Sequence, residues 1–212
     1  MIFKVSKDPQ KLKYLLNRVA ALLRDYKVGA IPTETFYALA CDPFSEIALE
    51  RLFNLKKRSP DKPILLLLGK MEDLSLVVAE VPELAKRVME LFWPGPLTIV
   101  MPAKRGLPQL LTAGLNTIGV RLSPCELTRQ IALAFGKPVT GTSANISGYP
   151  PCREAEEILR FFPNIDFVVD GGRSEATLPS TVVEINDKEI KLVREGAIPF
   201  REILAKIEGD SP

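Results

Sequence analysis

The sequence predicts an α/β protein, a single domain in which helices flank a mixed sheet. Three observations lead to this class. Apolar segments with helical spacing alternate with short apolar segments of strand length along most of the chain. Residues 64–68 form a continuous apolar run, typical of a strand buried on both faces. Two β-rich segments flank Asn186, Asp187 and Lys188, which indicates a hairpin and therefore an antiparallel pair near the C-terminus.

The expected elements follow in chain order from periodicity and from helix and turn signals. Ser45 is a suitable N-cap for the second expected helix, and Gly136 a suitable C-cap for the fourth. The segment WPGP ends the third helix. Helices are expected at residues 12–24, 46–55, 82–92, 126–135, 153–161 and 200–207, and strands at 28–31, 64–68, 97–101, 117–122, 138–141, 166–170, 180–185 and 189–194.

Size and composition are those of an ordinary globular protein. The chain has 212 residues, with 46% hydrophobic and 25% charged side chains, and no repeat or long linker divides it, so we expect one domain over residues 1–212. No apolar run has the length of about 18 residues that a membrane span needs. The first residues lack the features of a signal or transit peptide, and the three cysteines have no paired spacing. A cytoplasmic protein with reduced thiols and no membrane partner is expected.

The chain contains no histidine. This excludes Ser-His-Asp and Cys-His nucleophile systems and any zinc site that uses histidine. An enzyme with this composition must work through Lys, Arg, carboxylates, hydroxyls, backbone amides or a metal ion that enters with its substrate. The net charge of +2 is too small to drive nucleic-acid binding by itself, so such binding would need a local basic patch.

Two polar segments next to expected strands are candidates for a binding site. PTETFY at residues 32–37 follows a short strand, where α/β proteins usually bind ligands, although capping of a helix by Thr33 or Thr35 is slightly favoured by spacing alone. Residues 56–62 carry four cations. These cations either compensate the dipole of a helix C-terminus or bind a polyphosphate at the edge of the sheet. No P-loop motif is present.

Arg121 lies within an otherwise apolar strand, and a charge there is costly to bury unless it is paired. A structural ion pair and a site for a carboxylate are equally compatible with this position. The uncharged segment GTSANISG at residues 141–148 is either a capped turn, the more frequent meaning of such composition, or a ligand cradle. Gly171-Gly172-Arg173 is weak evidence when taken alone.

Several long motifs occur together, in an order and spacing that resemble the YrdC-like family over about residues 28–199. They are PTETFYALACDPF, LKKRSPDKPI, FWPGPLTIV, TIGVRL, TSANISGYPPC, PSTVVEI and LVREGAIP. The resemblance, to the short single-domain branch, implies an open, twisted α/β sheet around a concave basic cavity. It also implies a nucleotidyltransferase that makes threonylcarbamoyl-AMP and pyrophosphate from L-threonine, bicarbonate and ATP.

The resemblance implies a role for each motif residue. Thr35, Arg121, Ser143 and Ser180 would bind L-threonine. The ATP contacts would be Arg58, Lys62, Thr117, Asn145, Arg153 and Arg194. The catalytic set would be Lys56, Arg58 and Ser143, with Lys56 adding charge near the phosphates. Leu67 stands where some members have a histidine that helps to hold threonine, and Ala38-Leu39-Ala40 stands where glycines are common.

The same resemblance implies the partners. Mg²⁺ would arrive with ATP, so no tightly bound cofactor and no dedicated metal site are expected. The product would pass to tRNA threonylcarbamoyl transferase proteins for N6-threonylcarbamoyladenosine modification of tRNA, and the chain itself would have a possible tRNA or double-stranded RNA contact. The first alternative is a YrdC-like RNA binder without synthase activity. A second is the carbamoyl-adenylate chemistry of hydrogenase maturation, which normally belongs to a much larger protein.

Overall fold

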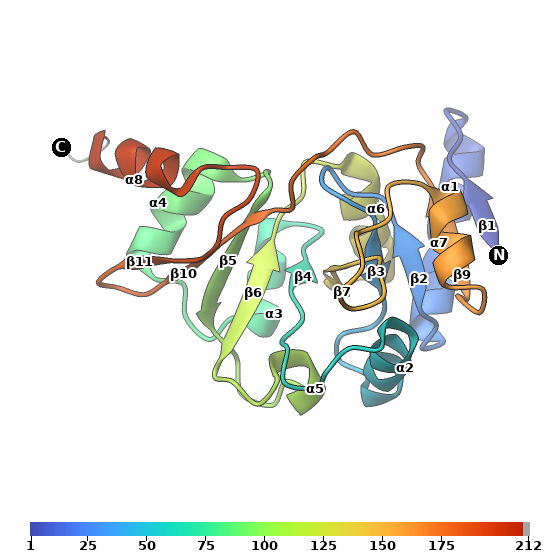
Figure 1. Cartoon of the computed structure of the whole chain (residues 1–212), viewed down its shortest axis with the longest axis horizontal. Coiled ribbons are helices and arrows are strands. Elements are labelled where there is room, and N and C mark those ends of the chain that lie inside the picture. The colour runs from blue at the N-terminus through green and yellow to red at the C-terminus, as the bar shows by residue number, and fades with distance from the viewer. Residues whose placement is uncertain (210–212) are drawn as a thin grey trace.

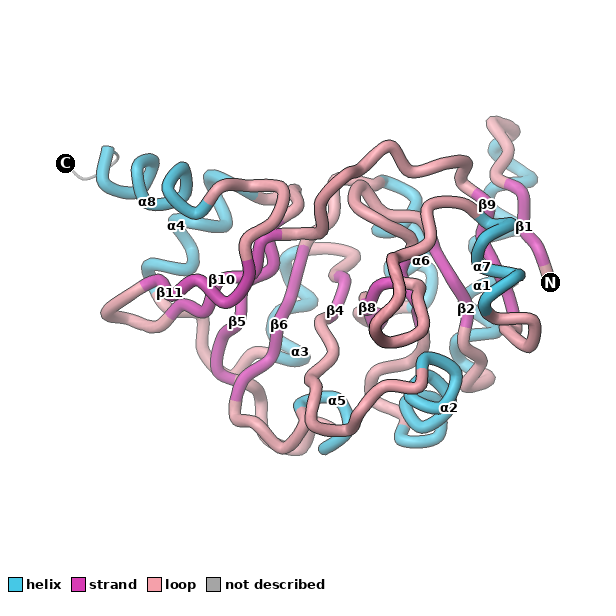
Figure 2. Tube along the Cα trace, in the orientation of Figure 1, coloured by secondary structure: helices cyan, strands magenta, loops and turns pink. Residues whose placement is uncertain are grey.

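A computed structural model describes residues 1–209 and shows an α/β protein with eleven strands in two sheets. Figures 1 and 2 show the sheets side by side, with helices packed around them. The five-stranded sheet has the order β1-β9-β2-β3-β8, and its strands are β1 (Ile2–Lys4), β9 (Phe167–Asp170), β2 (Gly29–Ile31), β3 (Ala38–Ala40) and β8 (Thr142–Ser143). The six-stranded sheet has the order β11-β10-β5-β6-β4-β7, and its strands are β11 (Ile190–Arg194), β10 (Thr181–Ile185), β5 (Leu97–Pro102), β6 (Thr117–Arg121), β4 (Leu66–Leu67) and β7 (Val139–Thr140).

Eight α-helices and one 3-10 turn, Met71–Asp73, complete residues 1–209. Helix α1 packs against α6, and α4 packs against α8. No helix in this described part of the chain combines the length and apolar character needed to cross a bilayer. The helices are α1 (Pro9–Arg24), α2 (Glu46–Lys56), α3 (Leu74–Val77), α4 (Glu83–Phe92), α5 (Gln109–Thr112), α6 (Glu126–Phe135), α7 (Ala155–Phe161) and α8 (Phe200–Gly209).

The local signals in the sequence are confirmed at several helix ends. Ser45 caps α2 by accepting a hydrogen bond from the Ala48 amide, and Gly136 ends α6 with a φ of 86°. Helix α1 begins three residues earlier than expected because Asp8 accepts hydrogen bonds from two amides of its first turn. The expected hairpin is formed by β10 and β11.

Several short elements lie outside the predicted pattern. Strands β1 and β3 and helices α3 and α5 have only three or four residues each, too few to establish a periodicity. The expected strand at residues 64–68 is reduced to Leu66–Leu67. The motif PTETFY caps no helix, because it connects β2 to the antiparallel strand β3. The slightly favoured interpretation of that motif was therefore wrong.

The chain passes between the two sheets at Gly141. Strand β7 pairs with β4 of the six-stranded sheet, and β8, which begins after that single glycine, pairs with β3 of the five-stranded sheet. A Cβ atom at Gly141 would lie 2.6 Å from Leu65 Cδ1 and 2.7 Å from Leu67 Cγ. Leu67 is fully buried there. The first glycine of GTSANISG is therefore required by close packing where the sheets meet.

Candidate functional site

A cavity of about 560 Å³ is lined by residues from both sheets. This volume lies within the usual range of small-molecule sites, about 300–1,000 Å³. Thr117, Gly119 and Arg121 all line it, because alternate residues of strand β6 face the same side. Neighbouring strands contribute in the same way, Thr98 and Val100 from β5 and Val182 from β10. The predicted site residues that line the cavity are Thr35, Arg58, Thr117, Arg121, Ser143, Ser180 and Arg194.

The charge of the cavity is entirely positive. Three guanidinium groups line it, from Arg58, Arg121 and Arg194, and no aspartate or glutamate is among its lining residues in the described chain. Burial lowers the pKa of each of these arginines, which nevertheless stay protonated at neutral pH because the ordinary pKa is so high. Hydroxyl groups from threonine and serine supply the remaining polar lining. Such a cavity suits an anionic ligand.

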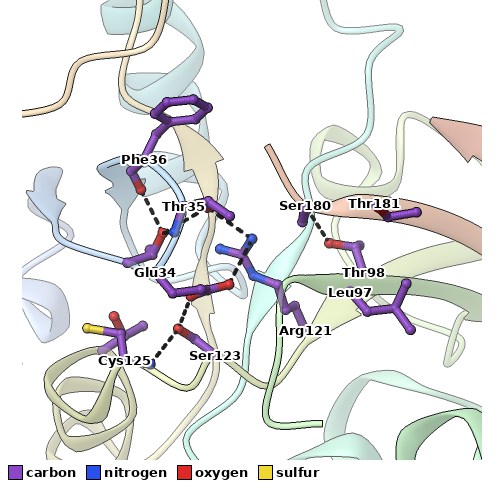
Figure 3. A network of polar contacts seen from close by, with 12 residues as sticks. Glu34, Thr35, Phe36, Leu97, Thr98, Arg121, Ser123, Cys125, Ser180 and Thr181 are labelled. Carbon is purple, nitrogen blue, oxygen red and sulfur yellow. Dashed lines mark hydrogen bonds and ion pairs between the residues drawn. The ribbon is translucent and has the colours of Figure 1, made fainter. Parts of the chain in front are cut away.

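Arg121 both forms an ion pair and lines the cavity. Its side chain is 4% exposed. Its Nη1 atom donates a hydrogen bond to Thr35 Oγ1 at 3.2 Å and lies 3.4 Å from Glu34 Oε1, as Figure 3 shows. Burial is the main cause of its lowered pKa, and the Glu34 carboxylate raises that pKa in part. Arg121 therefore has an ion pair and also a place on the cavity lining, so the structure is compatible with both interpretations that the sequence left equal, a structural ion pair and a site for a carboxylate.

Ser180 and Arg194 form a second polar cluster on the lining. The Ser180 hydroxyl is 2.9 Å from Thr98 Oγ1, and Arg194 Nη2 donates hydrogen bonds to the Ser180 carbonyl and hydroxyl. Burial lowers the pKa of Arg194, and the positive charge of Arg121 lowers it further. The threonine-binding candidates and Arg194 are thus gathered in one part of the molecule. Thr98 was missed, since a threonine in an apolar strand gives no signal.

The basic residues at and just after the C-terminal end of α2 lie in three different environments. Arg58 lines the cavity and donates hydrogen bonds to the carbonyls of Lys62 and Pro63. Lys62 is exposed and is not among the lining residues. Lys56 is 2% exposed and does not line the cavity either. The structure therefore brings only Arg58 of these three into the cavity.

Lys56 instead holds the GTSANISG loop. Its Nζ atom donates to the Ser143 carbonyl at 2.5 Å, to the Asn145 carbonyl at 3.0 Å and to Asn145 Oδ1 at 2.7 Å. Burial, and to a lesser degree the charge of Arg58, lowers the pKa of Lys56 to about 7. The signal was present in the sequence: Lys56 follows Leu49, Leu52 and Phe53 at helical spacing, on the buried side of α2.

Ser143 and Asn145 lie on the same loop in different positions. Ser143 lines the cavity, and its hydroxyl donates to Asn145 Oδ1 at 2.6 Å. Asn145 is not among the lining residues. Its Nδ2 group donates to the carbonyls of Ile146 and Tyr149. Both ends of the Asn145 amide are therefore used within the loop.

Arg153 holds residues 171–180, the segment that connects β9 of the five-stranded sheet to β10 of the six-stranded sheet. Its Nε and Nη2 groups donate to the carbonyls of Ser174 and Ala176, at 3.1 and 2.7 Å. The residue does not line the cavity, whereas Thr177 and Pro179 of the connecting segment do. Tyr37 supports the same segment by donating to the Gly172 carbonyl at 2.7 Å. The proposed nucleotide contact of Arg153 has no support in these contacts.

The fold and the cavity together define an α/β protein with a positively charged cavity lined by residues of both sheets. The family profile described as telomere recombination, Sua5/YciO/YrdC, matches residues 21–196. The chain belongs to this family.

Similar proteins share the fold over nearly the whole chain. A Pyrococcus abyssi protein named threonylcarbamoyl-AMP synthase is 35% identical over 188 residues, which cover 88% of this chain and 55% of the relative. The solved structure of P. abyssi Sua5 complexed with L-threonine has a TM-score of 0.89 and 32% identity, over 98% of this chain and 60% of that one. The crystal structure of Escherichia coli YciO has a TM-score of 0.83 and 26% identity, over 93% and 96% of the two chains. The chain thus spans little more than half the length of the P. abyssi relative.

Proposed function

We propose that this chain is a threonylcarbamoyl-AMP synthase, which joins L-threonine, bicarbonate and ATP and releases pyrophosphate. The observation that supports it most is a cavity that has no carboxylate among its lining residues in the part of the chain described, 1–209, and that gathers Arg121, Thr35 and Ser180, while Arg58 contributes a further cation. The threonine carboxylate and the ATP polyphosphate are two of the anionic groups of this reaction, and arginine binds both kinds through parallel hydrogen bonds. The names of the relatives point to the same reaction.

Strand β6 runs along the cavity, and the residues at both of its ends line it. Thr117 and Arg121 stand at opposite ends of β6, roughly 13 Å apart at about 3.3 Å per residue, and Gly119 between them adds no side chain of its own to the lining. We assign the Arg121 end to the threonine carboxylate and the Thr117 end to the nucleotide. Arg58 and Arg194 then neutralise the phosphates, with Mg²⁺ entering as part of the ATP substrate.

The proposed reaction needs few protein groups beyond these arginine, threonine and serine side chains. The threonine amine attacks the carbon of carbon dioxide and loses a proton, or attacks the carbon of bicarbonate, whose C–O bond breaks so that water leaves; either route gives a carbamate. A carbamate oxygen then attacks the α-phosphorus of ATP, the bond to the bridging oxygen breaks, and pyrophosphate leaves. For such phosphoryl chemistry it is sufficient that the protein positions the reactants and neutralises the charge that develops. This suits a chain without histidine.

The test is direct product detection. The purified chain is incubated with L-threonine, bicarbonate and Mg²⁺-ATP, and the products are measured by mass spectrometry together with a pyrophosphate assay. We expect threonylcarbamoyl-AMP and pyrophosphate in equal amounts, and neither when L-threonine is omitted. Absence of the adenylate from the complete mixture would contradict the synthase. Tight binding of double-stranded RNA or tRNA by such an inactive protein would favour the RNA-binding alternative instead.

A further inference from the structure

Glu34 is a carboxylate beside the cavity-lining residue Arg121, and the proposed reaction as described gives it no role. It lies between Thr33 and Thr35 in the connection from β2 to β3, and its side chain is 14% exposed. Ser123 donates a hydrogen bond to Glu34 Oε2, and Glu34 Oε1 lies 3.4 Å from Arg121 Nη1 (Figure 3). Oε1 is buried and has no hydrogen-bond partner among residues 1–209. Glu34 does not line the cavity.

The Glu34 carboxylate reduces the cost of burying Arg121. A guanidinium whose side chain is 4% exposed loses most of its hydration, and an unpaired buried charge is strongly destabilising. The negative charge of Glu34 favours the protonated arginine and offsets part of that loss. Without it, the guanidinium would be drawn toward water.

The same contact fixes the direction of the guanidinium. Its Nη1 atom is held by Thr35 Oγ1 and faces Glu34, whereas its Nε atom is buried and has no hydrogen-bond partner in residues 1–209. A guanidinium that is tethered through one nitrogen keeps its other donors for a planar, two-bond contact with a carboxylate. An unsatisfied buried donor on a cavity-lining arginine is a further sign that a ligand completes the site.

The support for Glu34 comes from a well-anchored turn at the start of α6. Ser123 is fully buried, its hydroxyl accepts a hydrogen bond from the Cys125 amide, and its carbonyl accepts one from Arg129. This turn therefore holds the serine hydroxyl that donates to Glu34. The chain of contacts runs from the helix start through Ser123 and Glu34 to the guanidinium of Arg121, the network drawn in Figure 3.

We propose that Glu34 is a positioning residue for the amino-acid site: it holds the Arg121 guanidinium in the orientation that binds the carboxylate of L-threonine. The identity of the ligand rests on the proposed function. Glu34 touches no substrate and acts only through Arg121.

The test measures the two substrates separately. L-Threonine binding is followed by titration calorimetry, and KM is determined for L-threonine and for ATP, with folding checked by circular dichroism. Glu34→Gln keeps the shape and removes the charge, and we expect it to raise Kd and KM for L-threonine about tenfold, the order expected when a close buried charge pair is lost. KM for ATP should change less than twofold. Arg121→Ala is the reference for complete loss of the carboxylate contact.

Asp42→Asn is a matched control. Asp42 is also a buried carboxylate, 8% exposed in its side chain and paired with Lys137 at 3.2 Å, but Lys137, unlike Arg121, does not line the cavity. We expect it to lower stability without changing Kd for L-threonine. If Glu34→Gln does not fold, Ser123→Ala decides, because it keeps the carboxylate and removes the hydroxyl that holds it; about a threefold rise in Kd for L-threonine is expected.

The outcomes separate this proposal from the function on which it rests. A wild-type chain that neither binds L-threonine nor forms the adenylate would overturn the proposed function and the role of Glu34 with it. A wild-type chain that does both, with a folded Glu34→Gln variant whose Kd for L-threonine is unchanged, would overturn the role of Glu34 alone. Equal losses for L-threonine and ATP would also overturn it, since they indicate a general structural role.

Discussion

At the scale of single residues, the protein buries two cations in different ways. Arg121 faces a carboxylate and a hydroxyl and keeps contact with the cavity. Lys56 has no acid beside it among residues 1–209, and its three hydrogen bonds go to oxygens of the GTSANISG loop. The first arrangement suits a residue that binds an anion, whereas the second suits one that holds a loop. Lys56 therefore stabilises the position of Ser143 through its hydrogen bond to the Ser143 carbonyl, without lining the cavity itself.

The lowered pKa of Lys56 predicts a pH-dependent stability. Because its folded pKa is about 7 and its ordinary value 10.5, the unfolded chain binds more protons between these limits. The free energy of unfolding should therefore rise with pH above about 7 through this group, by up to about 1.4 kcal/mol per pH unit. Lys56→Met removes the group, so urea unfolding between pH 7 and 8.5 should show a smaller slope against pH for the variant.

Comparison with the variant at each pH cancels the titrating groups that do not interact with Lys56. Burial raises the pKa of Cys41 to about 12 and that of Cys152 to about 11. Both thiols act in the opposite direction, mainly at higher pH, and they are present in both proteins. Equal slopes for wild type and Lys56→Met would show that Lys56 is not desolvated.

Sequence reasoning identified the residues of the site more reliably than their contacts. Arg121 was singled out because a charge in an apolar strand demands an explanation, and the structure places it on the lining of the cavity. Arg58 and Lys56 are two residues apart in one basic segment, yet one lines the cavity and the other packs under a loop. Composition cannot separate them. The helical phase of Lys56 would have placed it on the buried face.

At the scale of elements, Gly141 lets one stretch of chain serve both sheets. The sequence predicted a strand leading into GTSANISG, but the switch from β7 to β8 depends on hydrogen-bond partners far away in the chain. Hydrophobic periodicity indicates which residues form a strand, but it does not indicate which other strand pairs with them. The division of the strands into two sheets could not be predicted for the same reason.

The close contacts of Gly141 predict a selective sensitivity to a single methyl group. Gly141→Ala would place its Cβ within 2.7 Å of Leu67 Cγ and should lower the free energy of unfolding by about 1–3 kcal/mol through overpacking. Gly119→Ala is the matched control, because its Cβ would meet Thr98 Cγ2 at an ordinary 3.4 Å. Urea unfolding of both variants tests this. Equal stability of the two would contradict the packing assigned to Gly141.

At the scale of the whole molecule, the two sheets are also joined by residues 171–180. This segment runs from β9 of one sheet to β10 of the other, and Figure 1 shows it crossing between them in orange and red. Thr177, Pro179 and Ser180 of the segment line the cavity. Its position therefore affects the lining of the cavity.

The contacts of Arg153 predict how this connection is maintained. Arg153→Ala removes two hydrogen bonds to the carbonyls of Ser174 and Ala176, each worth roughly 1 kcal/mol or more, so amide hydrogen exchange at these residues should become several-fold faster. Affinities for L-threonine and ATP should fall together, because the loosened segment contributes lining residues to the shared cavity.

Arg173→Ala is the control for Arg153→Ala. It removes a more exposed ion pair between Arg173 and Glu154, which is worth little in water, and should leave exchange and both affinities nearly unchanged. A direct nucleotide contact of Arg153, which the family resemblance implied, makes a different prediction: ATP affinity alone would fall, with unchanged exchange at Ser174 and Ala176. That result would show that Arg153 turns into the cavity when ATP binds. Loss of both affinities with faster exchange would instead establish that Arg153 acts through the segment joining the two sheets.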